Sequence, residues 1–264
     1  LHDAHPQPAN RIGMIRSTIT KAALRLLTRY SPATGLYRSR IWTGPLRGMA
    51  FSTPRRERLS FALGTYERDL VQLALDLSPR DATVVDVGAN AGYFTLALAC
   101  AVGPLGRVLA FEPDPQNLCA LEQNLADNAI QHVTVCPAAV ADRPGEVLFS
   151  SFPYSLVGHL RRPDDADDAV QFKVPVTTLD AVFAIGKLPA LVKIDVEGAE
   201  LAVFRGGQQL FAQRRTTVLA EVRSEYFTTI NDLMRDAGYT TRVLTGGWDL
   251  SRDGLADVLF TPKP

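Results

Sequence analysis

Short apolar runs and helical repeats alternate along the chain from about residue 66 onward. Apolar residues at three- and four-residue steps predict amphipathic helices, whereas short β-branched runs bounded by turn residues predict strands. Strands are expected at 83–87, 107–111, 132–140, 191–196 and 217–222, and helices at 66–77, 94–102, 115–128, 200–210 and 227–237. This alternation predicts right-handed βαβ units and therefore an α/β fold: a mostly parallel sheet with helices on both faces.

Two segments depart from the alternation. Strands at 241–244 and 256–261 flank a turn-rich stretch, which predicts an antiparallel hairpin closing the sheet. Residues 144–180 contain two short strands and a run of aspartates, Asp164, Asp165, Asp167 and Asp168. An insertion at this place would overhang the carboxyl ends of the parallel strands, where such sheets bind ligands. It is therefore a candidate lid, although the aspartates alone fit a solvated loop tip equally well.

The first 63 residues form a different kind of segment. Residues 11–30 have a helical period with interleaved Lys and Arg and no acid, and residues 41–63 are short apolar runs that predict a small sheet or hairpin. We interpret 1–63 as a basic N-terminal extension and 64–264 as the main domain. The helix at 11–30 either packs against the body, which we favour, or contacts an anionic membrane surface peripherally.

Charge and composition narrow the classes of protein. The 28 basic and 28 acidic residues cancel, but residues 1–60 carry a net charge of +9 and the remainder −9. The acidic body argues against a general binder of nucleic acid. An apolar fraction of 46% predicts a globular protein, and no apolar run approaches the length of a membrane span. Three cysteines with no metal-binding spacing predict buried, reduced thiols and a cytoplasmic location.

The first candidate binding motif is V-V-D-V-G-A-N-A-G at residues 84–92. It follows a strand and opens a helix, so Gly88 would let a ligand approach the backbone next to free N–H groups. A dinucleotide-binding G-x-G-x-x-G pattern fails because Asn90 and Tyr93 occupy its glycine positions, and no P-loop lysine motif is present.

Two acidic motifs follow later strands. Glu112-Pro113 ends the next predicted strand, where a carboxylate can accept hydrogen bonds from a ribose diol. Three acids, Asp195, Glu197 and Glu200, follow the strand at 191–196. Glu200 fits a first-turn acid favoured by the helix dipole, but Asp195 lies at the carboxyl edge of the sheet, where chemistry is expected.

These motifs together resemble a known family. The segments VVDVGANAGYFTLALA, AFEPDPQNLCALEQNL and LVKIDVEGAELAVFRGG, in this order, are similar to the FkbM-type family of S-adenosylmethionine-dependent methyltransferases, as are G-T-Y-E at 64–67 and V-L-A-E-V at 218–222. The resemblance covers about residues 64–225. It implies a Rossmann-like sheet of seven strands with the last hairpin antiparallel, and methylation of hydroxyl groups on sugars or related natural products.

The resemblance also implies a set of cofactor-binding residues. It assigns to S-adenosylmethionine the residues Tyr66, Asp86, Gly88, Asn90, Gly92, Glu112, Pro113, Ala138, Ala139, Asp195 and Glu197. Within this set, the first glycine motif serves the methionine end, Glu112 the ribose, and Ala138 and Ala139 the adenine. Asp195 and Glu197 would face the sulfonium and the acceptor.

The acceptor hydroxyl must also lose a proton, so a base or a metal is expected. Asp195 is the first candidate base, and His159, in the predicted lid, is the second. Glu221 should end the strand next to that of Asp195, within about 5–6 Å of it, because neighbouring strands are about 4.8 Å apart. Two such carboxylates could instead bind Mg²⁺, which we keep as the minority hypothesis.

Three function classes stay open at this point. The leading one is an O-methyltransferase for a sugar, an oligosaccharide or another small molecule. A nucleic-acid or protein methyltransferase is the alternative, although the chain lacks an N-P-P-Y-like amino-methylation motif. An inactive S-adenosylmethionine-binding module is the third, against which stand the three intact motifs.

Overall fold

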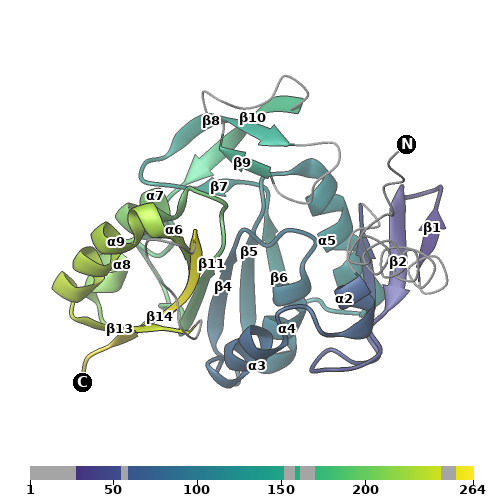
Figure 1. The fold of residues 1–264 in the computed structure, drawn as a ribbon, viewed down its shortest axis with the longest axis horizontal. Coiled ribbons are helices and arrows are strands. Elements are labelled where there is room, and N and C mark those ends of the chain that lie inside the picture. The colour runs from purple at the N-terminus through teal and green to yellow at the C-terminus, as the bar shows by residue number, and fades with distance from the viewer. Residues whose placement is uncertain (1–27, 55–58, 152–157, 161–169, 245–253) are drawn as a thin grey trace, which may run out of the picture.

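The computed structural model describes residues 28–54, 59–151, 158–160, 170–244 and 254–264. Seven of its strands form one sheet in the order β13-β14-β12-β11-β4-β5-β6 (Figure 1). They are β4 (Thr83–Val87), β5 (Arg107–Phe111), β6 (Val133–Cys136), β11 (Leu191–Ile194), β12 (Thr217–Arg223), β13 (Tyr239–Val243) and β14 (Leu255–Pro262). Within this order, the five neighbouring strands β12, β11, β4, β5 and β6 pair in parallel, and β14 is antiparallel to both β12 and β13. The predicted fold class is confirmed.

Helices cover both faces of this sheet because successive strand side chains point to opposite sides. Val84 and Val108 pack on one face under α3 (Arg68–Asp76), α4 (Tyr93–Val102) and α5 (Pro115–Asp127). Val85 and Leu109 pack on the other face, under α6 (Leu179–Val182), α7 (Glu200–Arg205), α8 (Gln208–Ala212) and α9 (Ser224–Asp236).

Two predicted elements are divided in the structure, and a third has a polar residue on its buried face. The strand expected at 132–140 is divided into β6 and β7 (Ala139–Val140), since Pro137 between them has no N–H for the ladder. The helix expected at 200–210 is broken at Gly206, where a Cβ would lie 2.0 Å from the carbonyl oxygen of Ala141. The amphipathic helix α5 buries a polar residue, Asn124, on its inner face beside Leu121 and Leu125.

The insertion forms a second sheet with β7. Strands β8 (Gly145–Ser151), β9 (Gly158–Leu160) and β10 (Val170–Thr177) join it in the order β7-β10-β8-β9. Figure 1 shows this small sheet above the upper ends of β4, β5 and β6. The aspartates at 164–168 lie outside the described residues. The lid role of the insertion stays a prediction.

The N-terminal extension contributes a third, antiparallel sheet of β1 (Arg29–Ser31), β2 (Leu36–Arg40) and β3 (Ala50–Thr53), followed by α2 (Leu59–Leu63). The expected small sheet is thus present, although it begins earlier than 41. The helix expected at 11–30 is wrong at its end, because Arg29–Ser31 form strand β1 and pair with β2. Residues 1–27 lie outside the described residues, so the membrane-contact hypothesis stays a prediction. Phe51 and Phe61 share the core of the main domain, so the core has no break at 63.

The three cysteines carry free thiols, but the prediction that they are buried is wrong. Cys100 and Cys119 are exposed and Cys136 is half-buried. Cys119 lies on α5 away from the buried face that contains Ala120 and Leu121. Among the described residues, no helix has the length and apolar character needed to cross a membrane.

Candidate active site

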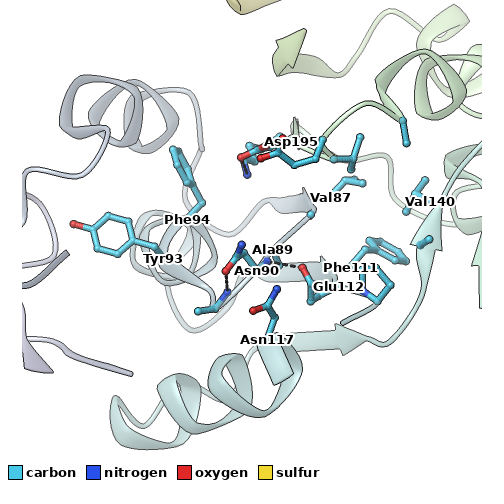
Figure 2. Close-up of a pocket in the computed structure, with 18 of the residues that line it drawn as sticks. Val87, Ala89, Asn90, Tyr93, Phe94, Phe111, Glu112, Asn117, Val140 and Asp195 are labelled. Carbon is cyan, nitrogen blue, oxygen red and sulfur yellow. Dashed lines mark hydrogen bonds and ion pairs between the residues drawn. The ribbon is translucent and has the colours of Figure 1, made fainter. Parts of the chain in front are cut away.

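A cavity opens at the carboxyl ends of β4, β5 and β11 (Figure 2). Strand order reverses between β4 and β11, and ligands in open α/β sheets bind at such a point. The residues predicted to bind the cofactor that line it are Tyr66, Gly88, Asn90, Glu112, Pro113, Ala138, Ala139, Asp195 and Glu197. Asp86 and Gly92, predicted with them, do not line it.

The two glycines of the first motif are required by close packing. Gly88 has a φ of +80°, and a Cβ on it would lie 1.8 Å from the carbonyl oxygen of Asp195. Gly92 has a φ of +90°, and its Cβ would lie 2.5 Å from Leu121 Cδ1 on α5. Gly88 therefore brings the loop after β4 against the loop after β11, and Gly92 lets α4 approach α5.

Asp86 lies behind the cavity rather than in it. Its side chain is fully buried, and Oδ2 accepts a hydrogen bond of 2.6 Å from Thr95 Oγ1. Oδ1 lies 3.6 Å from the ammonium of Lys193. The resemblance implied a place at the methionine end of the cofactor, whereas the structure places Asp86 as a partner of Lys193.

Glu112 is the most buried carboxylate on the cavity wall, with 4% of its surface exposed. Its Oε2 accepts a hydrogen bond of 2.7 Å from Asn90 N, and its Oε1 accepts one of 2.8 Å from Asp114 N. Burial nevertheless raises the pKa of Glu112 to about 7. A hydrogen bond with the Asn117 side chain lowers the pKa in the opposite sense. A carboxylate has about four lone-pair sites, so Glu112 keeps acceptor capacity for a vicinal diol beside these three partners.

The second polar region of the site is an acidic group just after β11 and near the carboxyl end of β12. Strand β12 continues to Arg223, two residues beyond the end expected at Glu221. Carboxylate oxygens of Asp195, Glu197 and Glu221 lie within 4.8 Å of one another. Asp195 and Glu221 are therefore close together, as expected, because β11 and β12 are paired in parallel. Arg223 Nη2 lies 3.6 Å from Glu197 Oε2.

Burial and neighbouring charge act together on Glu221. Burial raises its pKa first, and the carboxylates of Asp195, Glu197 and Asp257 raise it further, to about 8. Asp257 is opposite Glu221 in the β12–β14 ladder. A carboxyl group in this state exchanges its proton near neutral pH.

Lys193 lines the cavity and was missed by the sequence analysis. It is 5% exposed, with its ammonium 3.1 Å from Asp195 Oδ2 and 4.8 Å from the ring centre of Phe94. Burial alone would lower the pKa of Lys193, but the carboxylates of Asp195 and Asp86 raise it above its usual value. A lysine inside the apolar strand L-V-K-I, two residues before an acid, was the available signal.

Glu67, in the quoted G-T-Y-E segment, does not line the cavity, but its charge bears on Asp195, which does. Its backbone has a φ of +41° at the start of α3. Burial raises the pKa of Glu67, and the charge of Asp195 raises it further, which indicates that the two side chains interact electrostatically.

Aromatic side chains form another wall of the cavity. Phe51, Phe61, Tyr66 and Tyr93 all line it, and their ring centres lie 4.3 to 5.5 Å apart. Two of these rings come from the N-terminal extension. No local sequence pattern predicted that Phe51 and Phe61 would line the cavity, because they reach it only through tertiary packing.

His159 is placed only by its backbone, which lies in β9 opposite Ser150. Its side chain is outside the described part of the structure. The prediction that it serves as a base stays untested.

Known proteins support the assignment that the motifs suggested. A family model for the methyltransferase FkbM domain matches residues 86–241. Hexuronic acid methyltransferase AglP from Haloferax volcanii is 28% identical over 53% of this chain and 56% of its own length. Methyltransferase sdnD from Sordaria araneosa is 30% identical over 48% of this chain and 61% of its own. This chain thus spans little more than half the length of these relatives.

Among solved structures, methyltransferase FkbM from Methylobacillus flagellatus is 20% identical, with a TM-score of 0.47, over 69% of this chain and 44% of that one. The resemblance seen in the motifs is confirmed by the family match, which covers more than half of the chain. The protein belongs to the FkbM methyltransferase family.

Proposed function

We propose that this protein is an S-adenosylmethionine-dependent O-methyltransferase that acts on a hydroxyl group of a sugar, a glycan or a related natural product. The observation that carries the proposal is the pair of unlike carboxylates in one cavity. Buried Glu112 lies on one side, and Asp195 with its acidic neighbours lies on the other. The first suits a ribose, and the second suits a hydroxyl that must lose a proton.

The chain offers a suitable place for the cofactor. When bound, S-adenosylmethionine supplies an electrophilic methyl group. Glu112 would accept hydrogen bonds from its ribose, and Val87, Phe111 and Val140 offer apolar surface for its adenine. The buried carboxylate of Glu112 is held by its neighbours and keeps acceptor sites free, which is the structural reason why a diol fits here.

On the acceptor side we assign proton removal to Asp195. Lys193 holds Oδ2 of this carboxylate at 3.1 Å, which fixes its orientation in the cavity. The aromatic wall of Phe51, Phe61 and Tyr93 excludes water and presents flat apolar faces, which suit the apolar faces of a sugar ring. Aligning the hydroxyl and removing its proton are the tasks left to the protein.

A Mg²⁺ ion between Asp195 and Glu221 is the alternative for proton removal. Carboxylate oxygens this close are suitable hard ligands. Lys193 and Arg223 already bring positive charge to the group, which reduces its need for a cation. Activity that is lost in EDTA and restored by Mg²⁺ would establish the ion, whereas full activity in EDTA would leave Asp195 as the direct base.

The charge of the site bears on which sugar is accepted. Among the described residues, Glu67, Asp195, Glu197, Glu221 and Asp257 interact electrostatically, and the nearby cations are Lys193 and Arg223. Even with Glu221 protonated near neutral pH, the acids outnumber the cations, which supports a neutral acceptor over a carboxylated one. The relative AglP, by contrast, is named for a hexuronic acid.

Two measurements test the proposal. Calorimetry with S-adenosylmethionine should show binding, and its absence would contradict any methyltransferase role. A methyl-transfer screen should then include neutral sugars, hexuronic acids, oligosaccharides and RNA. We expect neutral sugars to be methylated, whereas methylation of RNA or protein alone would favour the alternative class.

A further inference from the structure

Two asparagines of α5 complete the edge of the N-terminal sheet. Strand β3 is the last in the order β1-β2-β3, so its outer backbone groups need partners elsewhere. Asn124 Oδ1 accepts a hydrogen bond of 2.6 Å from Ser52 N, and its Nδ2 donates one of 2.9 Å to Ser52 O. Asn128 does the same for Ala50, at 3.0 and 2.8 Å.

This match is geometric. Residues four apart on a helix are separated by about 6 Å along its axis, and residues two apart on a strand by about 6.6 Å. Each side-chain amide therefore takes the place of a peptide group of a neighbouring strand. Both asparagines hold β3, and to this point they are equivalent.

The third bond of each asparagine goes to a different place. Nδ2 of Asn128 donates a hydrogen bond of 2.8 Å to the carbonyl oxygen of Asn124, at the end of α5 itself. Nδ2 of Asn124 donates a hydrogen bond of 2.7 Å to the carbonyl oxygen of Ala91, in the loop that lines the cavity after β4. The preceding residue, Asn90, donates its N–H to Glu112. Asn124 thus lies between the loop fixed to the ribose-side carboxylate and the strand β3.

The other end of this connection is the aromatic wall. Phe51 lies between the two residues whose backbone the asparagines hold, and its ring lines the cavity 5.2 Å from that of Tyr93. The position of β3 therefore sets the position of this ring. Asn124 is 0% exposed, so solvent does not compete for its hydrogen bonds in the folded protein.

We propose that Asn124 is a positioning residue that couples cofactor binding at the Glu112 loop to the ordering of the Phe51 wall, on which the acceptor rests. The inference depends on the proposed function, because it needs a cofactor in this cavity. Binding would restrain the loop at Asn90 and Ala91, and Asn124 would pass that restraint to Ser52. The acceptor would then meet an ordered wall only after the cofactor has bound.

Hydrogen exchange of the β3 backbone amides, with and without saturating S-adenosylhomocysteine, tests the coupling. In the unmodified protein the ligand should slow exchange in residues 50–53 by about tenfold. Asn124→Ala should abolish the ligand-dependent slowing while still binding the ligand. The matched control Asn128→Ala removes the same kind of bonds to β3 and should keep the slowing, although its basal exchange rises.

The ratio of exchange rates with and without ligand separates coupling from simple support of β3, which would change both rates alike. Slowing that persists in Asn124→Ala, or that is absent from the unmodified protein, would overturn the inference. The measurement on the unmodified protein tests the inference even if Asn124→Ala does not fold. Asn124→Ser is a milder substitution that tests the same coupling. Failure of S-adenosylhomocysteine to bind in calorimetry would contradict the proposed function itself, and the inference with it.

Discussion

The two carboxylate regions of the cavity are held in place by different means. Glu112 is fixed by backbone N–H groups of Asn90 and Asp114 and is almost completely buried. Asp195 and Glu197 are half-buried and face cations, Lys193 and Arg223, on side chains. The ribose side is thus shaped by the backbone, whereas the acceptor side is shaped by side-chain charge.

Because of this difference, the two carboxylate regions should respond differently to amino-acid substitutions. Backbone donors keep their positions when surrounding side chains change, so the Glu112 region suits a ligand that never varies. A group of charged side chains responds to every substitution within it, because each charge shifts the others. We expect variants on the ribose side to alter cofactor affinity, and variants on the acceptor side to alter turnover and pH dependence.

The largest effect is expected from Asp195→Ala. Loss of the group that receives the hydroxyl proton should reduce kcat by about 10²–10⁴, while cofactor affinity changes only a few fold. Stopped-time methyl-transfer assays and calorimetry measure the two quantities. Glu122→Ala is the control, because it removes an exposed acid on α5 that does not line the cavity, and its activity should stay within about threefold. Near-normal turnover in Asp195→Ala would make Asp195 a structural partner of Lys193.

Glu112→Ala should act on binding instead. Charge-assisted hydrogen bonds to a ribose diol are worth about 1.5–3 kcal/mol each, so S-adenosylmethionine affinity should fall by about 10²-fold or more. Calorimetry measures this loss, with Glu122→Ala, an exposed acid on α5, as the control. An unchanged dissociation constant would remove Glu112 from the ribose site.

The smallest effect concerns stability and pH. The pKa of Glu221, about 8 in the folded protein, is above its ordinary value of 4.5, so its contribution to stability is complete below pH 4.5 and is lost as the pH rises through 8. Glu221→Gln does not lose this stability at high pH, because a glutamine side chain does not ionise. Its melting temperature should exceed that of the unmodified protein at pH 9, by roughly 2–4 °C if solvent screening leaves about 1 kcal/mol.

Thermal melts at pH 5, 7 and 9 measure this difference, and Glu122→Gln gives the exposed control. A Glu221→Gln variant whose stability advantage does not grow with pH would show that the pKa of Glu221 is not raised in the folded protein.

Much of this site was predictable from the sequence, for a definite reason. Strands such as Thr83–Val87 and Arg107–Phe111 are short, apolar and fully bounded by turn residues, so their ends could be located residue by residue. Because the fold fixes which strands are neighbours, the proximity of Asp195 and Glu221 followed from their places at strand ends.

What could not be predicted depends on contacts between distant segments. Phe51 reaches the cavity only because α5 holds β3, through asparagines more than 70 residues further along the chain. Asn124 itself lies on the buried face of an amphipathic helix, where an apolar residue is the ordinary expectation. The reason for Gly88 was likewise invisible, since the atom that excludes a side chain there belongs to Asp195.

The contact at Gly88 has a consequence for redesign. With no space for even one methyl group between this α-carbon and the Asp195 carbonyl, the separation of the ribose side from the acceptor side is fixed by the main chain. Attempts to change acceptor preference should therefore leave these two loops untouched. The tunable parts are the surfaces that other segments bring over the cavity, Phe51 and Phe61 from the N-terminal extension and Phe149 from the small sheet. A library confined to those positions would explore new acceptors while the reacting groups keep their alignment.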